Sequence, residues 1–408
     1  MGRRLIGILI ILLFLLFALS GCWSRSEIER LAMTTVLGHD KVTIDGQKKW
    51  LVSATVIKPR DLASQGPLGG NGSGGDKPTM LVSGIGATVW EAGRNLATRL
   101  PRREYIAHSN IVIIGEDLAR EGVDQLIDVL LRSKDIRLNT WVLVSKGPAL
   151  DVLKIEPELE ELLYQEIIGL VQNQPGSSKA FTIDIKRFIN QLITPGQDTA
   201  ASCIEIFERK EGDRGQGEGG SSKENPQKAV RVVGTAVFRK DKLVGFLDDS
   251  ETKGFLYVTG RAKQGIISLS LHEHAKKDVA FAMTRTSSRI IPKIDDDGVS
   301  FIVDIHAEGD LQQHEDTEPV ASPEIIKAIE EKAAQEIKAL VEKALNKAKK
   351  DFGADIFGFG RTLHKRYPQI WKGLEDDWRE IYPDIEVTVK AEAKIRRTGM
   401  LTDTPKIH

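Results

Sequence analysis

The chain has 408 residues, with 57 Lys and Arg against 58 Asp and Glu, so its formal net charge is −1. Apolar residues make up 41% of the sequence and charged residues 28%, a composition typical of globular domains that excludes wholesale disorder. A chain this close to neutral lacks the surplus of Lys and Arg that binding to nucleic-acid phosphates requires. The length predicts two or three domains, and two cysteines are too few for a disulfide framework.

The first residues predict export. Arg3 and Arg4 precede an uncharged, almost entirely apolar run over residues 5–19. As a helix this run would rise only about 22 Å, short of the roughly 30 Å hydrocarbon core of a bilayer. Its length and flanks are therefore typical of a secretory signal peptide and not of a membrane span.

The end of this run predicts where the signal is cleaved. Leu19-Ser20-Gly21-Cys22 matches the bacterial lipobox, with Leu three positions before Cys and small residues between them. The alternative is a plain signal peptide followed by an incidental cysteine. We expect removal of residues 1–21 and attachment of a diacylglycerol and an N-acyl lipid to Cys22, with no other cofactor. Cleavage removes two arginines and no acid, so the net charge becomes −3, and Cys203 remains the second cysteine.

Residues 22–200 are predicted to form an N-terminal α/β domain. Residues 23–32 predict a short helix or tether, and Asp45-Gly46 suits a type I′ hairpin turn between two strands. Residues 65–78 consist mainly of Gly, Ser, Pro and Asn and predict a loop. A strand, a helix and a second strand beyond residue 110 predict a βαβ-like unit. The expected strands are 36–44, 48–57, 110–114 and 140–144, and the expected helices are 88–99, 117–132, 158–172 and 183–192.

Residues 201–275 are predicted to form a middle domain. Residues 211–227 lack every large apolar residue and predict a flexible loop or linker. The other expected elements are a strand at 202–209, a hairpin of 229–238 and 242–247, a helix at 250–258 and a strand at 265–272.

Residues 276–400 are predicted to form a C-terminal α+β domain, followed by a tail at 401–408. A hairpin of 279–294 and 299–308 turns at Asp297-Gly298. Ser322 is a suitable N-cap for a long amphipathic helix over residues 323–351. We favour packing of this helix on the preceding sheet over a coiled coil, because its small alanines permit close approach. A helix at 369–381 and a strand at 385–395 complete an α+β fold of three mixed α/β domains with antiparallel hairpins.

Motifs that carry enzyme chemistry are weak in this sequence. His272 and His274 share a strand face but have no further ligands at diagnostic spacing, so we expect no metal site. Gly74-Gly75-Asp76-Lys77 lacks the Gly-Lys-Ser/Thr of a phosphate-binding loop. No serine lies in a Gly-x-Ser-x-Gly elbow, and we expect no catalytic residue.

Two sets of residues are candidates for partner contact. His108 precedes an apolar strand, and we favour a buried structural histidine over a subunit contact. Phe357 and Phe359 are each followed by a glycine, Gly358 and Gly360, which permit positive φ or close backbone approach. These phenylalanines either cap the core at a helix end or form an aromatic knob that docks on a partner. Trp371 and Trp378 lie seven residues apart and share a helix face, which suits either role.

Several segments together resemble the C subunits of spore germinant receptors, the Ger(x)C family of spore germination lipoproteins. The family commonly has an acidic residue and an aliphatic residue where this chain has Ser24 and His39. The order and spacing of the matches carry the resemblance over nearly the whole mature chain. The matching segments are Cys22-Trp23, Glu27-Ile28, Leu31-Ala32, Leu37-Gly38 with Asp40, His108 before Ile111-Val112-Ile113-Ile114-Gly115-Glu116, Leu118-Ala119-Arg120, Leu131-Arg132 with Asp135 and Arg137, Gly234-Thr235-Ala236-Val237-Phe238, Lys242-Leu243-Val244-Gly245, Glu251-Thr252-Lys253-Gly254, Asp355-Ile356-Phe357-Gly358-Phe359-Gly360, and Pro368 with Trp371 and Trp378.

The resemblance implies a location and partners for the chain. It implies three mixed α+β domains and a lipoprotein on the outer face of the inner spore membrane. The expected partners are a polytopic permease-like B subunit and a membrane-associated A subunit, in a complex that senses nutrients and triggers germination. The expected role is non-enzymatic, in assembly or signalling, and the sequence leaves open whether this subunit contacts the nutrient.

The alternative function is a stand-alone extracytoplasmic solute-binding lipoprotein. Such a chain should show two similar α/β lobes joined by crossing strands, and no internal repeat is apparent here. An extracytoplasmic hydrolase is disfavoured by the missing nucleophile and base.

Overall fold

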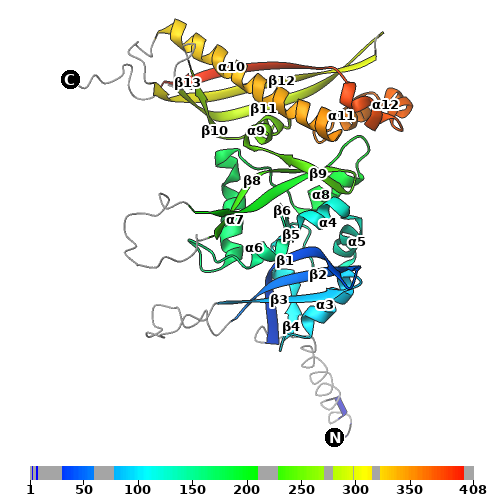
Figure 1. The fold of residues 1–408 in the computed structure, drawn as a ribbon. Coiled ribbons are helices and arrows are strands. Elements are labelled where there is room, and N and C mark those ends of the chain that lie inside the picture. The colour runs from blue at the N-terminus through cyan, green and yellow to red at the C-terminus, as the bar shows by residue number, and fades with distance from the viewer. Residues whose placement is uncertain are drawn as a thin grey trace, which may run out of the picture.

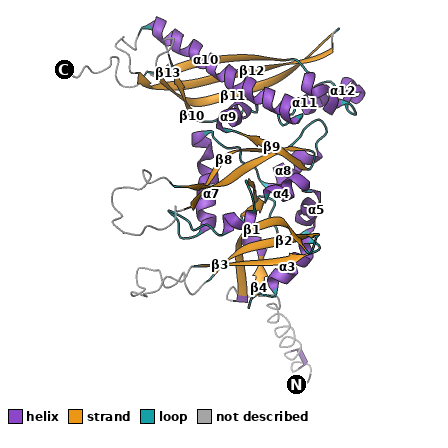
Figure 2. Cartoon of the chain, in the orientation of Figure 1, coloured by secondary structure: helices purple, strands orange, loops and turns teal. Residues whose placement is uncertain are grey.

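The computed structural model describes residues 2, 6–7, 30–58, 78–209, 228–270, 279–296, 298–314 and 322–398. Within them the chain forms two β-sheets with helices packed on both, so the α+β fold class is confirmed (Figure 1). Figure 2 shows the two sheets as separate layers with helices between and around them. Several expected features lie outside the described residues, namely most of the signal peptide, Cys22, Trp23, the loops at 65–77 and 211–227, His272, His274, Asp297 and the tail at 401–408.

The larger described sheet has the strand order β3-β2-β1-β5-β6-β7-β8-β9, with β4 beside β1. Its centre is parallel, because β1, β5, β6 and β7 run in one direction, and both wings are antiparallel. The parallel pair β5–β6 confirms the predicted βαβ-like unit. The strands are β1 (Leu31–Ile44), β2 (Gln47–Ile57), β3 (Thr79–Gly86), β4 (Arg103–Tyr105), β5 (Ile111–Ile114), β6 (Trp141–Ser145), β7 (Ala200–Glu208), β8 (Lys228–Arg239) and β9 (Lys242–Leu247).

The β1–β2 hairpin follows the local sequence signals except at its start. Asp45 and Gly46 have φ of 53° and 74°, the left-handed values of the predicted type I′ turn. Leu31 and Ala32, expected in a helix or tether, instead belong to β1. The expectation was wrong because Leu31 pairs in parallel with Arg103 of β4, a partner too distant in sequence for a local pattern to reveal.

Helices cover the larger sheet; two of the predicted helices differ from the structure, and α6 was not predicted. The helix expected over 117–132 is broken at Gly122, whose φ is 135°. The helix expected from residue 158 begins only at Leu163, and the backbone N–H groups of residues 158–160 donate to the carboxylate of Glu166 in its first turn, which holds these residues in a turn before the helix. The helices are α3 (Val89–Ala97), α4 (Glu116–Glu121), α5 (Asp124–Arg132), α6 (Ala149–Leu153), α7 (Leu163–Ser177) and α8 (Ile185–Ile193), with the 3₁₀ turn η2 (Ile106–His108).

The smaller described sheet has the order β10-β11-β12-β13. The strands of the expected middle region belong to both sheets, since β7–β9 extend the larger sheet and β10 starts the smaller one. The three-domain division at residues 200 and 275 therefore stays a prediction. The elements are α9 (Asp249–Val258), β10 (Gly265–Leu269), β11 (Val279–Asp295), β12 (Gly298–His314), α10 (Pro323–Asn346), the π-helical turn η4 (Lys347–Phe352), α11 (Phe359–Arg366), α12 (Pro368–Leu374), α13 (Trp378–Ile381), the 3₁₀ turn η5 (Tyr382–Asp384) and β13 (Val387–Arg397).

Helix α10 lies across the smaller sheet, as predicted. The Ser322 hydroxyl caps it by accepting from the Ile325 N–H at 3.2 Å. Its apolar stripe is buried against α9 and β13, so packing on the sheet is confirmed (Figure 1). The single helix expected over 369–381 is divided between α12 and α13, and α11 before it was not predicted. The fully buried residues of the stripe are Ile329, Ala333, Ile337, Val341 and Ala344.

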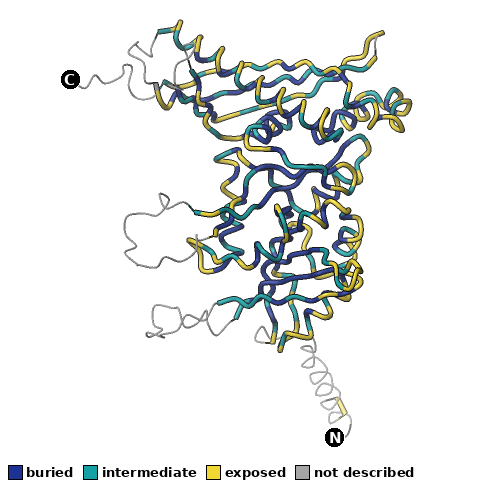
Figure 3. The backbone as a smooth tube through the Cα atoms, in the orientation of Figure 1, coloured by how far each residue is buried: buried dark blue, intermediate teal, exposed yellow. Residues whose placement is uncertain are grey.

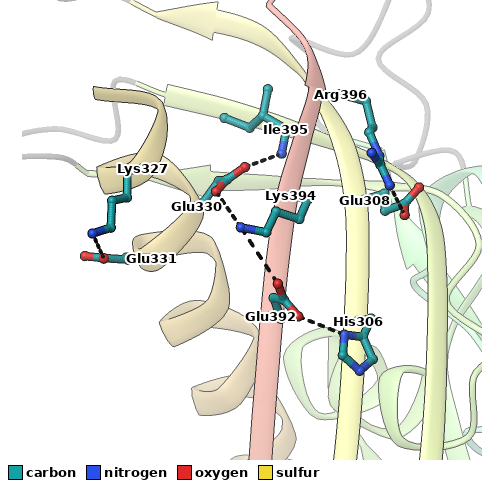
Figure 4. A network of polar contacts seen from close by, with 9 residues as sticks. All are labelled: His306, Glu308, Lys327, Glu330, Glu331, Glu392, Lys394, Ile395 and Arg396. Carbon is teal, nitrogen blue, oxygen red and sulfur yellow. Dashed lines mark hydrogen bonds and ion pairs between the residues drawn. The ribbon is translucent and has the colours of Figure 1, made fainter. Parts of the chain in front are cut away.

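A polar network fastens α10 to the edge strand β13 (Figure 4). Glu330 on α10 accepts the backbone N–H of Ile395 at 2.9 Å and pairs with the ammonium of Lys394 at 3.2 Å. On the neighbouring strand β12, His306 Nδ1 lies 3.1 Å from Glu392. An exposed strand edge is a site for unwanted pairing, and Glu330 satisfies one of its donors.

The two sheets share one hydrophobic core. Buried side chains of α8, α9, α10, β8 and β12 belong to a single cluster, and a second, smaller cluster fills the other face of the larger sheet under α6 and α7. Figure 3 shows buried backbone continuing from the larger sheet into the layer below α10.

The close approach of α9 and α10 depends on Gly254. A Cβ at this position would lie 2.0 Å from the Leu340 carbonyl oxygen, which is backbone and cannot move aside. We expect Gly254→Ala to lower the free energy of unfolding by about 1–3 kcal/mol, because overpacking forces the helices apart. Urea unfolding measures this change.

Gly169→Ala in α7 is the matched control. A Cβ there would meet nothing within 4 Å, so the substitution should raise stability by about 0.5–1 kcal/mol through backbone entropy alone. Equal effects of the two substitutions would contradict the packing argument.

Candidate functional site

The structure brings six of the candidate residues together just after η4. Phe357, Gly358, Phe359 and Gly360 lead into α11, and Trp371 and Trp378 lie on α12 and α13. The four aromatic side chains are at most 5% exposed. They therefore occupy the chain's own core and offer no surface on which a partner could dock.

The carboxylate of Asp355 organises this segment. Its Oδ1 accepts the N–H groups of Gly358 and Phe359 at 2.8 and 3.0 Å. Its Oδ2 accepts the Gly360 N–H at 2.8 Å and the Trp378 indole N–H at 3.2 Å. Because four donors converge on one buried side chain, the turn and the start of α11 are held in one conformation.

A second carboxylate, Asp198, joins this segment to the larger sheet. Asp198 follows α8, and its backbone N–H donates to the Asp355 carbonyl at 2.9 Å. In return the Asp355 N–H donates to Asp198 Oδ2 at 3.0 Å. Asp198 Oδ1 accepts the backbone N–H of Lys240 at 2.9 Å and faces the Arg379 guanidinium at 3.5 Å. We refer to Asp198, Asp355 and the residues bonded to them as the junction.

Two glycines, Gly196 and Gly360, allow the two chain segments of the junction to approach closely enough for these bonds to form. The Arg361 N–H donates to the Gly196 carbonyl at 2.8 Å. Gly196 has a φ of 71°, and a Cβ on it would lie 2.5 Å from the Trp371 ring. A Cβ on Gly360 would lie 2.8 Å from the Gly196 Cα and 2.7 Å from Trp378. Only glycine fits at either position.

A chain of contacting aromatic rings continues the junction into both sheets. The neighbouring pairs have centroids 4.9–5.7 Å apart in tilted or edge-on arrangements, which stabilise a core beyond area burial. The rings, in spatial order from the larger sheet to the smaller, are Phe181, Phe255, Phe357, Phe359 and Phe301.

Burial sets the electrostatics of the junction. It raises the pKa of Asp355 to about 7, and the Asp198 carboxylate adds to the increase, against the lowering effect of the backbone N–H donors. Burial also raises the pKa of Tyr382 well above 10. A cavity of about 210 Å³ beside Asp198 and Trp371 adjoins the two carboxylates.

The junction is suited to holding elements together. Both carboxylates accept mainly backbone N–H groups, and no serine or cysteine nucleophile hydrogen-bonds to them in the described residues. Burial raises the pKa of the Cys203 thiol to about 12, so this thiol is protonated at neutral pH. Within the described ranges no three His, Cys, Asp or Glu side chains gather as a metal site would require.

His108 and Arg132 lie apart from the junction. His108 ends the 3₁₀ turn η2 and is exposed, so the expectation of a buried histidine was wrong. The following residue, Ser109, takes the buried position, and its hydroxyl bonds the Ile111 carbonyl at 3.1 Å. Arg132 is exposed on α5 and pairs with Asp128 at 2.8 Å one helical turn away.

Within the segment Leu37-Gly38-His39-Asp40, Asp40 has a structural role. The Asp40 carboxylate accepts the N–H groups of Ala149 and Leu150 at 2.8 and 2.9 Å and so caps α6. Burial raises the pKa of Asp40. His39 beside it is 3% exposed, and burial lowers its pKa to about 4, so its ring is neutral at physiological pH.

Sequence reasoning did not identify Gly196, Asp198 or Arg379 as members of the junction. Pro195-Gly196 is a turn signal that could have indicated a special backbone at this point. Nothing local to Asp198 indicates a partner 157 residues later in the chain.

Two family models match the chain with this fold. "Spore germination protein N-terminal domain" matches residues 24–206, and "Spore germination B3/ GerAC like, C-terminal" matches residues 233–399. The chain belongs to the GerAC-like family of spore germination proteins.

Individual relatives are similar over their whole length. The chain is 26% identical to spore germination protein YndF of Bacillus subtilis (strain 168), covering 97% of this chain and 98% of that protein. It is 27% identical to spore germination protein KC of the same organism, covering 96% and 95%. The crystal structure of the GerBC protein has the same fold, with a TM-score of 0.54 at 17% identity, over 88% of this chain and 97% of that one.

The role of Asp355 can be tested by Asp355→Asn. An amide has only one acceptor oxygen, so two of the four N–H donors would face an NH₂ group in either orientation. We expect the free energy of unfolding to fall by about 2–3 kcal/mol, since buried donors are left unpaired. Denaturant unfolding measures the loss. Asp384→Asn, at an exposed carboxylate paired with Lys350, is the control and should change little.

The raised pKa of Asp355 also predicts a pH dependence. The folded chain binds a proton at this group below about pH 7, whereas the ordinary value is 3.8. The folded state thus holds more protons between these values, so this group's contribution to stability falls as the pH rises from about 4 to about 7. The stability difference between wild type and Asp355→Asn should therefore shrink over that interval. A difference that grows with pH would contradict the assignment.

Proposed function

We propose that this chain is the lipid-anchored C subunit of a nutrient germinant receptor and acts in assembly or signalling of the complex that triggers germination. The observation that carries the proposal is end-to-end similarity to spore germination proteins KC and B3, which covers at least 95% of this chain in each case. Similarity over the full length favours a shared role over reuse of one domain.

Attachment through Cys22 is consistent with the described structure. Among the described residues, no helix combines the length and the apolar character that crossing a bilayer requires. Cys22 lies nine residues before Leu31, where β1 of the larger sheet begins, so even a fully extended chain would keep this end of the sheet within roughly 32 Å of the lipid. The diacylglycerol and N-acyl chain would place the protein on the outer face of the inner spore membrane.

The partners we propose are the polytopic permease-like B subunit and the membrane-associated A subunit. The junction fits a structural role without enzymatic activity, because its carboxylates are occupied by backbone donors. A shared core and a fixed junction would hold the smaller sheet in a constant position relative to the anchored larger sheet. Such a body is suited to contact with other subunits.

The alternative, a stand-alone solute-binding lipoprotein, predicts two similar lobes. The described sheets differ in size and strand order, and the long helix α10 covers only the smaller one. This difference favours the receptor subunit.

Membrane attachment is tested by Cys22→Ala. The variant should carry no lipid and should move from the membrane fraction to the soluble fraction, because the thiol that accepts the diacylglycerol is gone. Labelling with a fatty-acid analogue and fractionation measure both effects.

Cys203→Ala, at the buried thiol, is the control and should remain lipidated and membrane-bound. Undiminished membrane retention of Cys22→Ala would contradict the anchor. The receptor role itself would be overturned if the tagged chain co-purified with no polytopic subunit and its deletion left nutrient-triggered germination unchanged.

A further inference from the structure

A cavity of about 410 Å³ lies apart from the junction, at the other end of the larger sheet. Leu37 and His39 of β1 and Val52 of β2 form its buried floor. Residues of α3, α5, β4 and η2 and of the loops beside them line the rest. Its volume is in the range of about 300–1,000 Å³ that is usual for small-molecule sites.

One of the floor residues, His39, carries a buried polar atom that the fold leaves unpaired. The ring is 3% exposed, and its Nδ1 has no hydrogen-bond partner among the described residues. An unpaired buried nitrogen costs free energy unless something bonds to it. Because burial lowers the pKa of His39 to about 4, the ring is a neutral donor and acceptor at physiological pH.

The remaining lining divides into an apolar part and a charged part. Val89 on α3, Val129 on α5 and Ile106 on η2 contribute apolar surface. The charged lining groups are three exposed arginines and two acids, of which Glu104 is half-buried, and burial raises its pKa to about 7. The cavity therefore carries a net positive charge. The charged side chains are Arg94, Arg102, Arg103, Glu104 and Asp135.

We propose that this cavity binds a small amphipathic anion, whose apolar body lies on the floor of Leu37 and Val52 and whose carboxylate or phosphate head group lies at the arginines. Guanidinium groups bind such oxyanions through paired N–H donors. The inference goes beyond the proposed receptor role, because it assigns this subunit a ligand of its own.

Gly93 offers a way to close the cavity without disturbing the fold. It lies inside α3 and lines the cavity, and a Cβ there would meet nothing within 4 Å. Gly93→Leu would add an apolar side chain to open space and replace a glycine in a helix, which favours helix stability. Gly169→Leu in α7 makes the same change at a position that does not line the cavity.

The test is calorimetric titration of the purified full chain with sodium 4-methylpentanoate, with 4-methylpentanamide as the neutral isostere. We expect binding of the anion at millimolar or tighter Kd and weaker binding of the amide. Gly93→Leu should weaken binding at least about tenfold, which is a change of about 1.4 kcal/mol, whereas Gly169→Leu should leave it unchanged.

Arg103→Gln should weaken binding of the carboxylate but not of the amide, and Arg132→Gln on the exposed face of α5 should affect neither. Competition by dihexanoyl phosphatidylglycerol would support the same site with a membrane lipid as the source of the anion. No binding of either anion, or binding that Gly93→Leu leaves intact, would overturn the proposal. Neither result bears on membrane attachment, which the Cys22→Ala experiment tests separately.

Discussion

The reciprocal bonding of Asp198 and Asp355 is the constraint on which the arrangement of this molecule depends. A buried carboxylate is tolerated only where donors surround it, and here backbone N–H groups from both sides of the junction supply most of them. Neither side can move away without leaving a charged or polar group unpaired. The aromatic side chains of Phe357, Phe359, Trp371 and Trp378 then pack against a backbone that is already fixed.

This arrangement explains why a segment that looks like a docking motif is internal. The glycines at 358 and 360 and the tryptophans at 371 and 378 serve the close approach of two parts of the same chain. Any surface for contact with another protein must therefore lie elsewhere, on exposed residues of the sheets and helices. At the cavity beside His39, the fold leaves one buried polar atom, His39 Nδ1, without a hydrogen-bond partner among the described residues.

Much of the fold could be predicted from the sequence, because many elements carry their own start and stop signals. Thr88 caps α3 by accepting the Glu91 N–H, and Asp45-Gly46 closes the first hairpin. The capping box of Asp248 and Glu251 begins α9 within a residue of its predicted start. In each case the deciding contacts lie within a few residues.

The predictions that were wrong or missing depend instead on contacts between residues far apart in the sequence. Gly122 breaks a continuous helical pattern at a point where the next N–H, from Val123, donates to the Asp241 carbonyl far along the chain. The junction likewise pairs Asp198 with Asp355, and the residues next to either aspartate do not predict this contact. For the candidate site, the sequence identified residues 357–360 and both tryptophans but not the aspartate opposite them, since burial of Asp198 is decided only by the complete fold.

The 157-residue separation of Asp198 and Asp355 has a consequence for the order in which the chain folds. Contacts between residues far apart in sequence form late, because closing the intervening loop costs conformational entropy before these contacts can stabilise the chain. A chain that is synthesised from its amino terminus contains Asp198 well before Asp355 is available. The carboxylate of Asp198 therefore lacks its partner until residue 355 has been made.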